Sequence, residues 1–137
     1  MADYSVKKIH HLGFVVHDLD KTLEKWEALF GVKAEICEKP ELNVRYGAME
    51  IGGVSFVINE STKPGSRWEK FLDEHGEGLE HVALEVDDID NASEAAQERG
   101  FELRFDQQKL IHGLMTNFVE GMGVTDVEFM GPDKSSK

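Results

Sequence analysis

The sequence predicts an α+β protein in which two tandem βαβββ modules form a curved mixed sheet around a shared metal cleft. The segment that begins at His11 is repeated in the segment that begins at His81. Each copy continues into a helical pattern and then into three short apolar runs typical of strands. A module of about 55 residues buries too little surface to be stable alone, so two copies are expected to pack together.

The repeat appears when residues 11–20 are aligned with residues 81–90. The two histidines coincide, three apolar positions coincide, and the segments end in Asp-Leu-Asp and Asp-Ile-Asp. A pseudo-twofold relation between the modules would bring such equivalent positions face to face. The first residues of both copies are therefore candidates for one common site.

A helix is expected after each repeated strand, over residues 21–30 and 91–99. Apolar side chains recur at helical spacing in both segments. Aspartates are common N-caps and a glycine often follows the last turn. The sequence therefore predicts that these helices are capped and ended by the residues that flank them: Asp20, Asp90, Gly31 and Gly100.

Three strands are expected in each module after its helix, because short apolar runs there are separated by glycine-containing turns. The predicted ranges are 33–37, 44–50, 54–59, 102–105, 116–119 and 125–130.

We expect one domain that comprises all 137 residues. Its predicted parts are module one over about 7–61, a linker over 62–78, module two over about 79–131, and a polar tail over 132–137. A short helix is expected within the linker, around residues 67–74.

The composition excludes several classes of partner. The net charge of −12 disfavours nucleic acids and anionic membranes, which require basic surfaces. A small-molecule substrate is the expected partner, and Arg45, Arg104 and Lys109 can supply positive charge if it is an anion. One cysteine, Cys37, and the absence of a signal peptide or long apolar run predict a cytoplasmic protein. Cys37 has no neighbouring base in the sequence and is interpreted as inert.

His11, His81 and Glu128 are the candidate metal ligands. Side chains alternate between the two faces of a strand, so each of the three shares a face with residues two positions away. A lone histidine in an apolar strand is usually a hydrogen-bonded core residue, but two at equivalent repeat positions favour ligation. Glu128 lies in an apolar strand, where a carboxylate needs a partner. His10 points to the opposite face from His11 and is the less favoured alternative.

Two imidazoles and one carboxylate suit iron(II), zinc, manganese, cobalt or nickel better than calcium. Three protein ligands leave positions open for substrate, water or dioxygen. The counterpart of Glu128 in module one is Phe56 or Val57, depending on where a gap is placed in the hairpin. Neither residue can bind a metal.

Three motifs resemble the vicinal oxygen chelate superfamily of glyoxalases, bleomycin resistance proteins and extradiol dioxygenases. They are Ile9-His10-His11-Leu12-Gly13, Gly76-Glu77-Gly78-Leu79-Glu80-His81 and Val127-Glu128-Phe129. The resemblance covers about residues 8–131 and implies a metal-dependent enzyme, commonly a homodimer. Its substrate would be a small molecule that chelates the metal through adjacent oxygens.

The resemblance leaves the reaction open. The segment Gly78–Val86 and the His112-Gly113 loop look most like methylmalonyl-CoA epimerases, and Glu41 lies where such epimerases carry a glutamate base. A site whose fourth position, at Phe56 or Val57, is apolar looks more like the dioxygenase members, in which iron(II) keeps positions free for substrate and oxygen. The resemblance therefore makes iron(II) the favoured metal. We therefore expect a dioxygenase-like or lyase-like reaction. The alternatives are a methylmalonyl-CoA epimerase or glyoxalase-type isomerase or lyase, and a metal-free protein that sequesters a small molecule.

Glu128, Tyr46 and His112 are the candidate catalytic residues. Glu128 can exchange a proton as well as bind the metal. Tyr46 can donate a hydrogen bond to a substrate oxygen, or it can be a strand aromatic that packs the sheet. His112 lies in a predicted loop over the cleft, where it is either an acid or base near neutral pH or an exposed loop residue.

Overall fold

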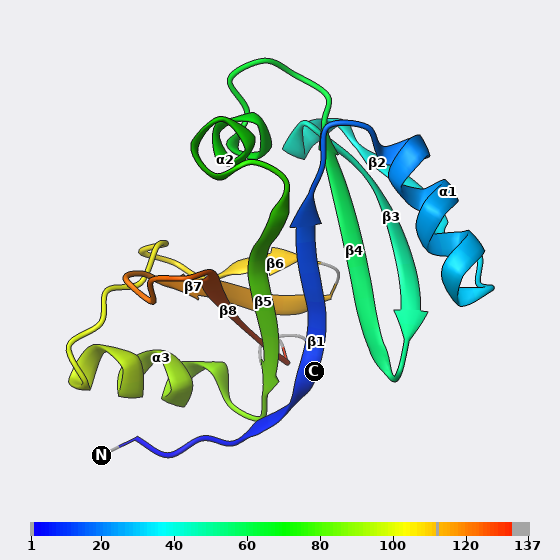
Figure 1. Cartoon of the computed structure of the whole chain (residues 1–137). Coiled ribbons are helices and arrows are strands. Elements are labelled where there is room, and N and C mark those ends of the chain that lie inside the picture. Colours follow the sequence, from blue (N-terminus) through cyan, green and yellow to red (C-terminus); the bar gives the residue numbers. More distant parts are fainter. Residues whose placement is uncertain (1, 112, 133–137) are drawn as a thin grey trace. The chain divides into compact units, whose positions relative to one another are not determined.

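The α+β class and the βαβββ order of both modules are confirmed (Figure 1). The computed structural model describes residues 2–111 and 113–132. The first module has these elements: β1 (Val6–Val15), α1 (Leu19–Phe30), β2 (Glu35–Lys39), β3 (Val44–Ile51) and β4 (Val54–Ser61). The second has these: β5 (Gly78–Val86), α3 (Ile89–Glu98), β6 (Lys109–Ile111), β7 (Leu114–Val119) and β8 (Asp126–Pro132). A 3-10 turn, η1 (Pro40–Leu42), follows β2, and the predicted linker helix is present as α2 (Arg67–His75).

The chain forms two compact units. Unit 2 is His11–Glu80, and unit 1 comprises Met1–His10 and His81–Lys137. Strands β1 and β5 each cross a boundary, so each contributes residues to both units. The predicted single domain, with its module and linker boundaries, stays a prediction.

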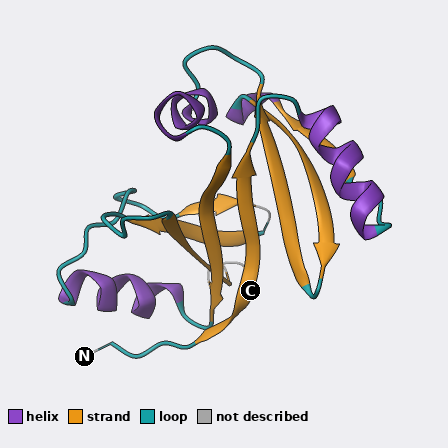
Figure 2. Cartoon of the chain, viewed as in Figure 1, coloured by secondary structure: helices purple, strands orange, loops and turns teal. Residues whose placement is uncertain are grey.

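In unit 2 the strand order is β2-β3-β4-β1, with β1 parallel to β4 and the other pairs antiparallel (Figure 2). Helix α1 covers one face of this sheet. Its apolar stripe completes a buried cluster of residues from α1, β3, β4 and the position just after β1: Val16, Leu19, Leu23, Met49 and Ile58. The packing is close, because a Cβ atom built at Gly47 of β3 would lie 2.7 Å from Leu23.

Helix α2 packs against a different set of unit 2 residues. Trp68 of α2 is buried with Val15 and Val44, and its indole N–H donates a 3.0 Å hydrogen bond to the carbonyl oxygen of Leu42. Val15 and Val16 are consecutive, so strand alternation directs them to opposite faces. The sheet of unit 2 therefore has an α1 face and an opposite face, which carries His11, Gly13 and Val15.

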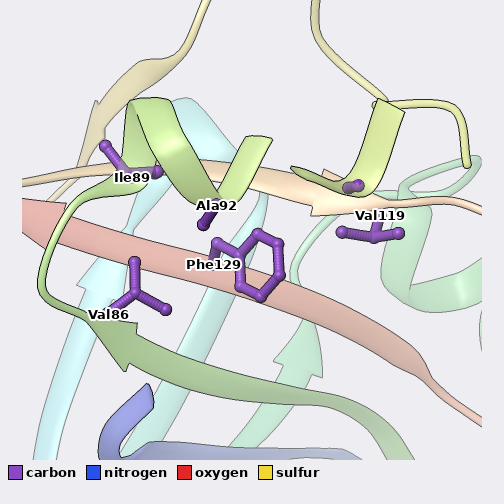
Figure 3. Close-up of a cluster of buried hydrophobic side chains, with 6 residues drawn as sticks. Val86, Ile89, Ala92, Val119 and Phe129 are labelled. Carbon is purple, nitrogen blue, oxygen red and sulfur yellow. The ribbon is translucent and has the colours of Figure 1, made fainter. Parts of the chain in front are cut away.

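In unit 1 the strand order is β5-β8-β7-β6, with β5 parallel to β8 and the remaining pairs antiparallel. Helix α3 covers one face and buries small and branched side chains against β5, β7 and β8 (Figure 3). The cluster contains these residues: Val86, Ile89, Ala92, Ala96, Val119 and Phe129. The strands of both units belong to one eight-stranded sheet, and each unit contains parallel and antiparallel pairs, so the predicted mixed sheet is confirmed.

The predicted N-caps, Asp20 and Asp90, are wrong by two residues. The side chain of Asp18 accepts from the N–H of Lys21, and that of Asp88 accepts from Asn91, so both helices begin earlier. The reason lies in burial. Leu19 and Ile89 open the two helices, and both are buried, so anchoring each first turn in the core displaces the cap toward the strand. The stop at Gly31 is confirmed, with φ of 68°.

The strand predicted over residues 102–105 is also wrong. Only an isolated bridge from Leu103 to Val119 forms there. The backbone N–H and carbonyl of Phe105 are instead bonded to the side-chain amide of Asn117. Because the Asn117 side chain occupies these two backbone groups, they cannot pair with another strand. Regular strand pairing resumes only at β6.

Among the described residues, no helix combines the length and the apolar character that crossing a membrane requires. Most of the predicted polar tail, residues 133–137, lies outside the described part of the chain.

Candidate metal centre

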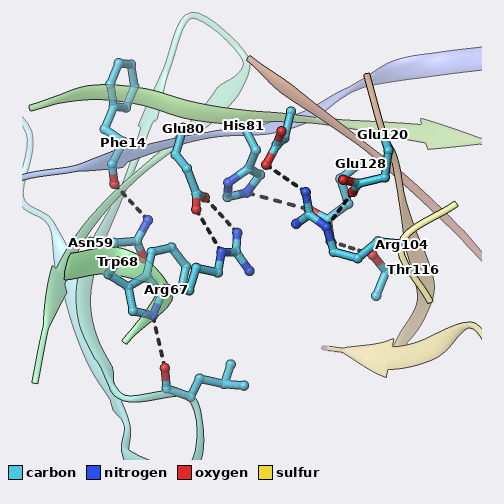
Figure 4. A network of polar contacts seen from close by, with 12 residues as sticks. Phe14, Asn59, Arg67, Trp68, Glu80, His81, Arg104, Thr116, Glu120 and Glu128 are labelled. Carbon is cyan, nitrogen blue, oxygen red and sulfur yellow. Dashed lines mark hydrogen bonds and ion pairs between the residues drawn. The ribbon is translucent and has the colours of Figure 1, made fainter. Parts of the chain in front are cut away.

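Within unit 1 the structure brings His81 and Glu128 together. His81 lies in β5 and Glu128 in β8, and strand alternation turns both away from α3. The Nε2 atom of His81 lies 3.6 Å from Oε1 of Glu128 (Figure 4), and both side chains are about 6% exposed. Each carries an atom that can bind a metal. A buried acid–imidazole pair at this separation offers two such atoms to one ion.

Thr116 of β7 holds the Glu128 carboxylate from the other side. Its hydroxyl donates to Oε2 of Glu128, and Thr116 itself is fully buried. One oxygen of Glu128 thus accepts from threonine while the other faces His81. Bonds of this kind fix the orientation of ligating carboxylates. The sequence analysis missed Thr116, although alternation along its strand places it on the same face as Glu128.

Phe118, also of β7, forms the wall beside His81. It is paired with Glu128 across the ladder, and its ring meets the His81 imidazole edge-on at a centroid distance of 5.8 Å. The buried ring excludes water from one side of the imidazole. A dry, shaped environment of this kind strengthens charge interactions at a metal site.

His11 is the first residue of unit 2 and is half-buried in β1. It is paired with Ser55 in the parallel ladder to β4. As predicted, it shares a face with Gly13 and Val15, and this is the face that α1 leaves open. Its participation in one site with His81 and Glu128 stays a prediction.

The strand register identifies the counterpart of Glu128 in unit 2. Glu128 is paired with Ala83, two residues after His81. In unit 2 the residue two positions after His11 is Gly13, and its partner is Val57. Val57 is therefore the residue of unit 2 that corresponds to Glu128. Phe56 points to the α1 face, where its ring lies 5.8 Å from that of Trp26.

Tyr46 lies on the same face of unit 2 as Val57. It is paired with Asn59 of β4 and with Cys37 of β2. Burial, and next a hydrogen bond with the Cys37 side chain, raise the pKa of Tyr46 to about 12. The phenol therefore stays protonated near neutral pH, so it can donate a hydrogen bond to a substrate oxygen but is a poor base.

The three cations proposed for an anionic substrate already have partners. Arg104 donates to Glu120 and Asp126 at 2.6 and 2.8 Å. Burial lowers its pKa, but those two hydrogen bonds more than offset the effect and raise it. Arg45 is bonded to Asp20 of α1, so it lies on the α1 face, away from His11. The ammonium of Lys109 lies 4.2 Å over the ring of Phe105.

Two further candidates were predicted to lie near the site. Glu41 is exposed within η1. His112 lies outside the described residues, so its predicted role as an acid or base stays a prediction.

Comparisons with known proteins agree with the resemblance seen in the sequence. The model of the family described as the Glyoxalase/Bleomycin resistance protein/Dioxygenase superfamily matches residues 10–114. This range includes both repeated segments, residues 11–20 and 81–90, with both of their histidines.

Solved structures with the same fold cover nearly the whole chain. A hypothetical protein from Bacillus halodurans C-125 is 22% identical with a TM-score of 0.83, over 95% of this chain and 97% of that one. A methylmalonyl-CoA epimerase variant from Streptomyces coelicolor, in complex with 2-nitronate-propionyl-CoA, is 24% identical with a TM-score of 0.82 and the same coverage. Another methylmalonyl-CoA epimerase is 29% identical with a TM-score of 0.78, over 92% and 95% of the chains.

Proposed function

Because the chain belongs to the Glyoxalase/Bleomycin resistance protein/Dioxygenase superfamily, we propose that it is a metal-dependent enzyme. Its substrate is a small molecule that binds the metal through adjacent oxygens, and His11, His81 and Glu128 hold the ion. The observation that carries this proposal is the buried pair of His81 and Glu128, with the carboxylate oriented by Thr116.

The donor set fits a divalent transition metal. Two imidazoles and one carboxylate are ligands that iron(II), zinc, cobalt, nickel and manganese accept. His11 occupies the position of the repeat that corresponds to His81, which supports its assignment as the third ligand.

The bound ion would polarise the substrate oxygens and stabilise negative charge that develops on them. Protein residues supply the rest of the chemistry. Thr116 and Phe118 keep the ligands oriented and dry, and the Tyr46 phenol is protonated and suited to hydrogen-bond a substrate oxygen. Glu128 remains the group best placed to exchange a proton.

Within this class we favour an iron(II) dioxygenase-like or lyase-like reaction. Val57 stands at the register position of Glu128 and has no ligand atom. Three protein ligands leave more positions for substrate and dioxygen than four would. The second candidate is an epimerase, supported by the epimerase structures that share the fold. Two-sided proton exchange needs a second carrier, and the raised pKa of Tyr46 makes it a poor one.

Metal content and reaction type separate these functions. Protein purified without chelator is expected to contain iron and to consume oxygen with a panel of catechols and α-keto acids. Zinc, cobalt or nickel, together with deuterium uptake from solvent into methylmalonyl-CoA, would instead establish the epimerase. If the protein binds none of these metals, even after reconstitution, the proposal of a metal-dependent enzyme is refuted. The remaining function is then that of a metal-free protein that binds a small molecule.

Removing the Thr116 hydroxyl is expected to weaken metal binding. Thr116→Val keeps the volume but leaves Oε2 of Glu128 without this donor. Loss of a group that orients a ligand typically costs 10- to 100-fold in metal affinity, and we expect about 10-fold. The measurement is a competition titration against a chromophoric chelator.

Thr116→Ser is the matched control, since it restores a hydroxyl at the same position. The proposed orientation of Glu128 is supported if the serine variant binds the metal about as tightly as the wild type and the valine variant binds it more weakly. Equal affinities in all three proteins would show that Thr116 has only a packing role.

The protein is expected to act in the cytoplasm as a homodimer, without nucleic acid or membrane partners. These expectations rest on the composition and on the resemblance to the superfamily.

A further inference from the structure

Unit 2 contains a pocket that the metal centre does not use. It has a volume of about 490 Å³ and lies between the first two turns of α1, the end of β1 and the start of β5. This volume falls within the range of about 300 to 1,000 Å³ typical of small-molecule sites. Its floor includes Phe14, Val16 and Ile58, which belong to the α1 face. The pocket therefore opens on the side of the sheet opposite to His11 and Val57.

The floor of the pocket is apolar and aromatic. Phe14 and Trp26 line it, and their rings meet at a centroid distance of 5.6 Å. Gly78 contributes a wall without a side chain, and a Cβ atom built there would meet nothing within 4 Å. Half-buried aromatic rings beside open space offer a surface for a flat apolar group.

Two lysines stand at the rim. Lys21 and Lys25 are one helical turn apart on α1, so their ammonium groups share a face, and like charges at this spacing repel. Both are exposed, and neither forms an ion pair with any residue that the structure describes. They are the pocket's unpaired cations, in a chain whose net charge is −12.

The pocket also contains two carboxylates, and both are occupied by backbone donors. Asp18 accepts the N–H of Lys21 as the N-cap of α1, and Glu77 accepts the N–H of His17 at 2.8 Å. These bonds offset part of the negative charge of each carboxylate, whereas neither lysine forms an ion pair with a described residue.

We propose that this pocket binds a planar aromatic anion, a flat ring system that carries a carboxylate or a phosphate. The ring contacts Phe14 and Trp26, whose planes are tilted by 60°, and the anionic group is bound by Lys21 and Lys25. The proposal does not depend on the metal-dependent reaction, because its residues lie on the other face of the unit 2 sheet.

The two tryptophans allow a direct test. We would titrate the ¹⁵N-labelled full chain with 1-naphthoate and with 1-naphthyl phosphate and follow both indole N–H resonances. Trp26 lines the pocket, whereas the indole of Trp68 is bonded to Leu42 on the opposite face. We expect the Trp26 resonance to shift and the Trp68 resonance to stay in place.

Charge variants test the role of the rim. The double variant Lys21→Ala/Lys25→Ala is expected to bind both probes at least 10-fold more weakly and to lose most of the salt dependence. Lys63→Ala/Lys70→Ala is the matched control, because it removes the same charge from exposed lysines elsewhere in unit 2. It should bind like the wild type.

Three results would each overturn the proposal. They are no shift of Trp26 up to the solubility limit of both probes, a shift of Trp68 in place of Trp26, and equal affinity in the two double variants. The neutral probe 1-naphthalenemethanol is expected to bind more weakly than 1-naphthoate, and equal binding of the two would also refute the assigned role of the lysines.

Discussion

Replacement of Glu128 by alanine is expected to reduce metal affinity more than about 100-fold, beyond the range seen for groups that only orient a ligand. The carboxylate lies 3.6 Å from His81 in a buried environment, so no solvent-exposed group can easily replace it. Glu128→Gln keeps the side-chain volume and can still accept from Thr116. If Glu128 binds the metal, the glutamine variant should fold normally and still lose most of the metal. Elemental analysis and a chelator competition titration measure both.

Alanine variants of the adjacent residues His10 and His11 test which histidine binds the metal. His10→Ala should retain metal, whereas His11→Ala should lose it, because consecutive strand residues point to opposite faces. Folding of each variant would be checked by circular dichroism. Loss of metal in His10→Ala with retention in His11→Ala would mean that the wrong histidine was chosen. Unchanged metal content in Glu128→Gln would show that the Glu128 carboxylate is not a metal ligand.

Leu23→Ala is expected to destabilise the protein by about 3 kcal/mol. Leu23 is 3% exposed and packs against Gly47 so closely that no Cβ atom fits between them. Alanine would leave a cavity that the helix cannot close without moving off the sheet. For a chain of this size the change corresponds to a fall in melting temperature of about 10 °C.

Leu29→Ala is the matched control, because it is the same substitution in the same helix. Leu29 is 78% exposed, so its loss should change the free energy of unfolding by less than about 0.5 kcal/mol. Denaturant unfolding of both variants measures the difference. Equal effects would show that α1 does not pack on the sheet through Leu23.

The sequence predicted the elements that repeat. Periodicity identified both βαβββ modules, and strand alternation correctly placed Glu128 away from Val127 and Phe129. It did not predict the register between strands, which depends on hydrogen bonds between residues distant in the chain. Consequently it left Phe56 and Val57 as equal alternatives, and only the ladder between β1 and β4 distinguishes them.

One error arose where a side chain competes with the backbone for hydrogen bonds. Asn117 bonds both backbone groups of Phe105 and ends the strand predicted there. Such long-range side-chain bonds leave no local pattern in the sequence. Thr116 was missed for a related reason, because a threonine in an apolar strand has a high strand propensity whether or not its hydroxyl orients a ligand.

Strands β1 and β5 run from one compact unit into the other. A gene fragment that encodes residues 11–80 alone would truncate both strands, and so would one that encodes only the remainder. Neither fragment is therefore a separable building block.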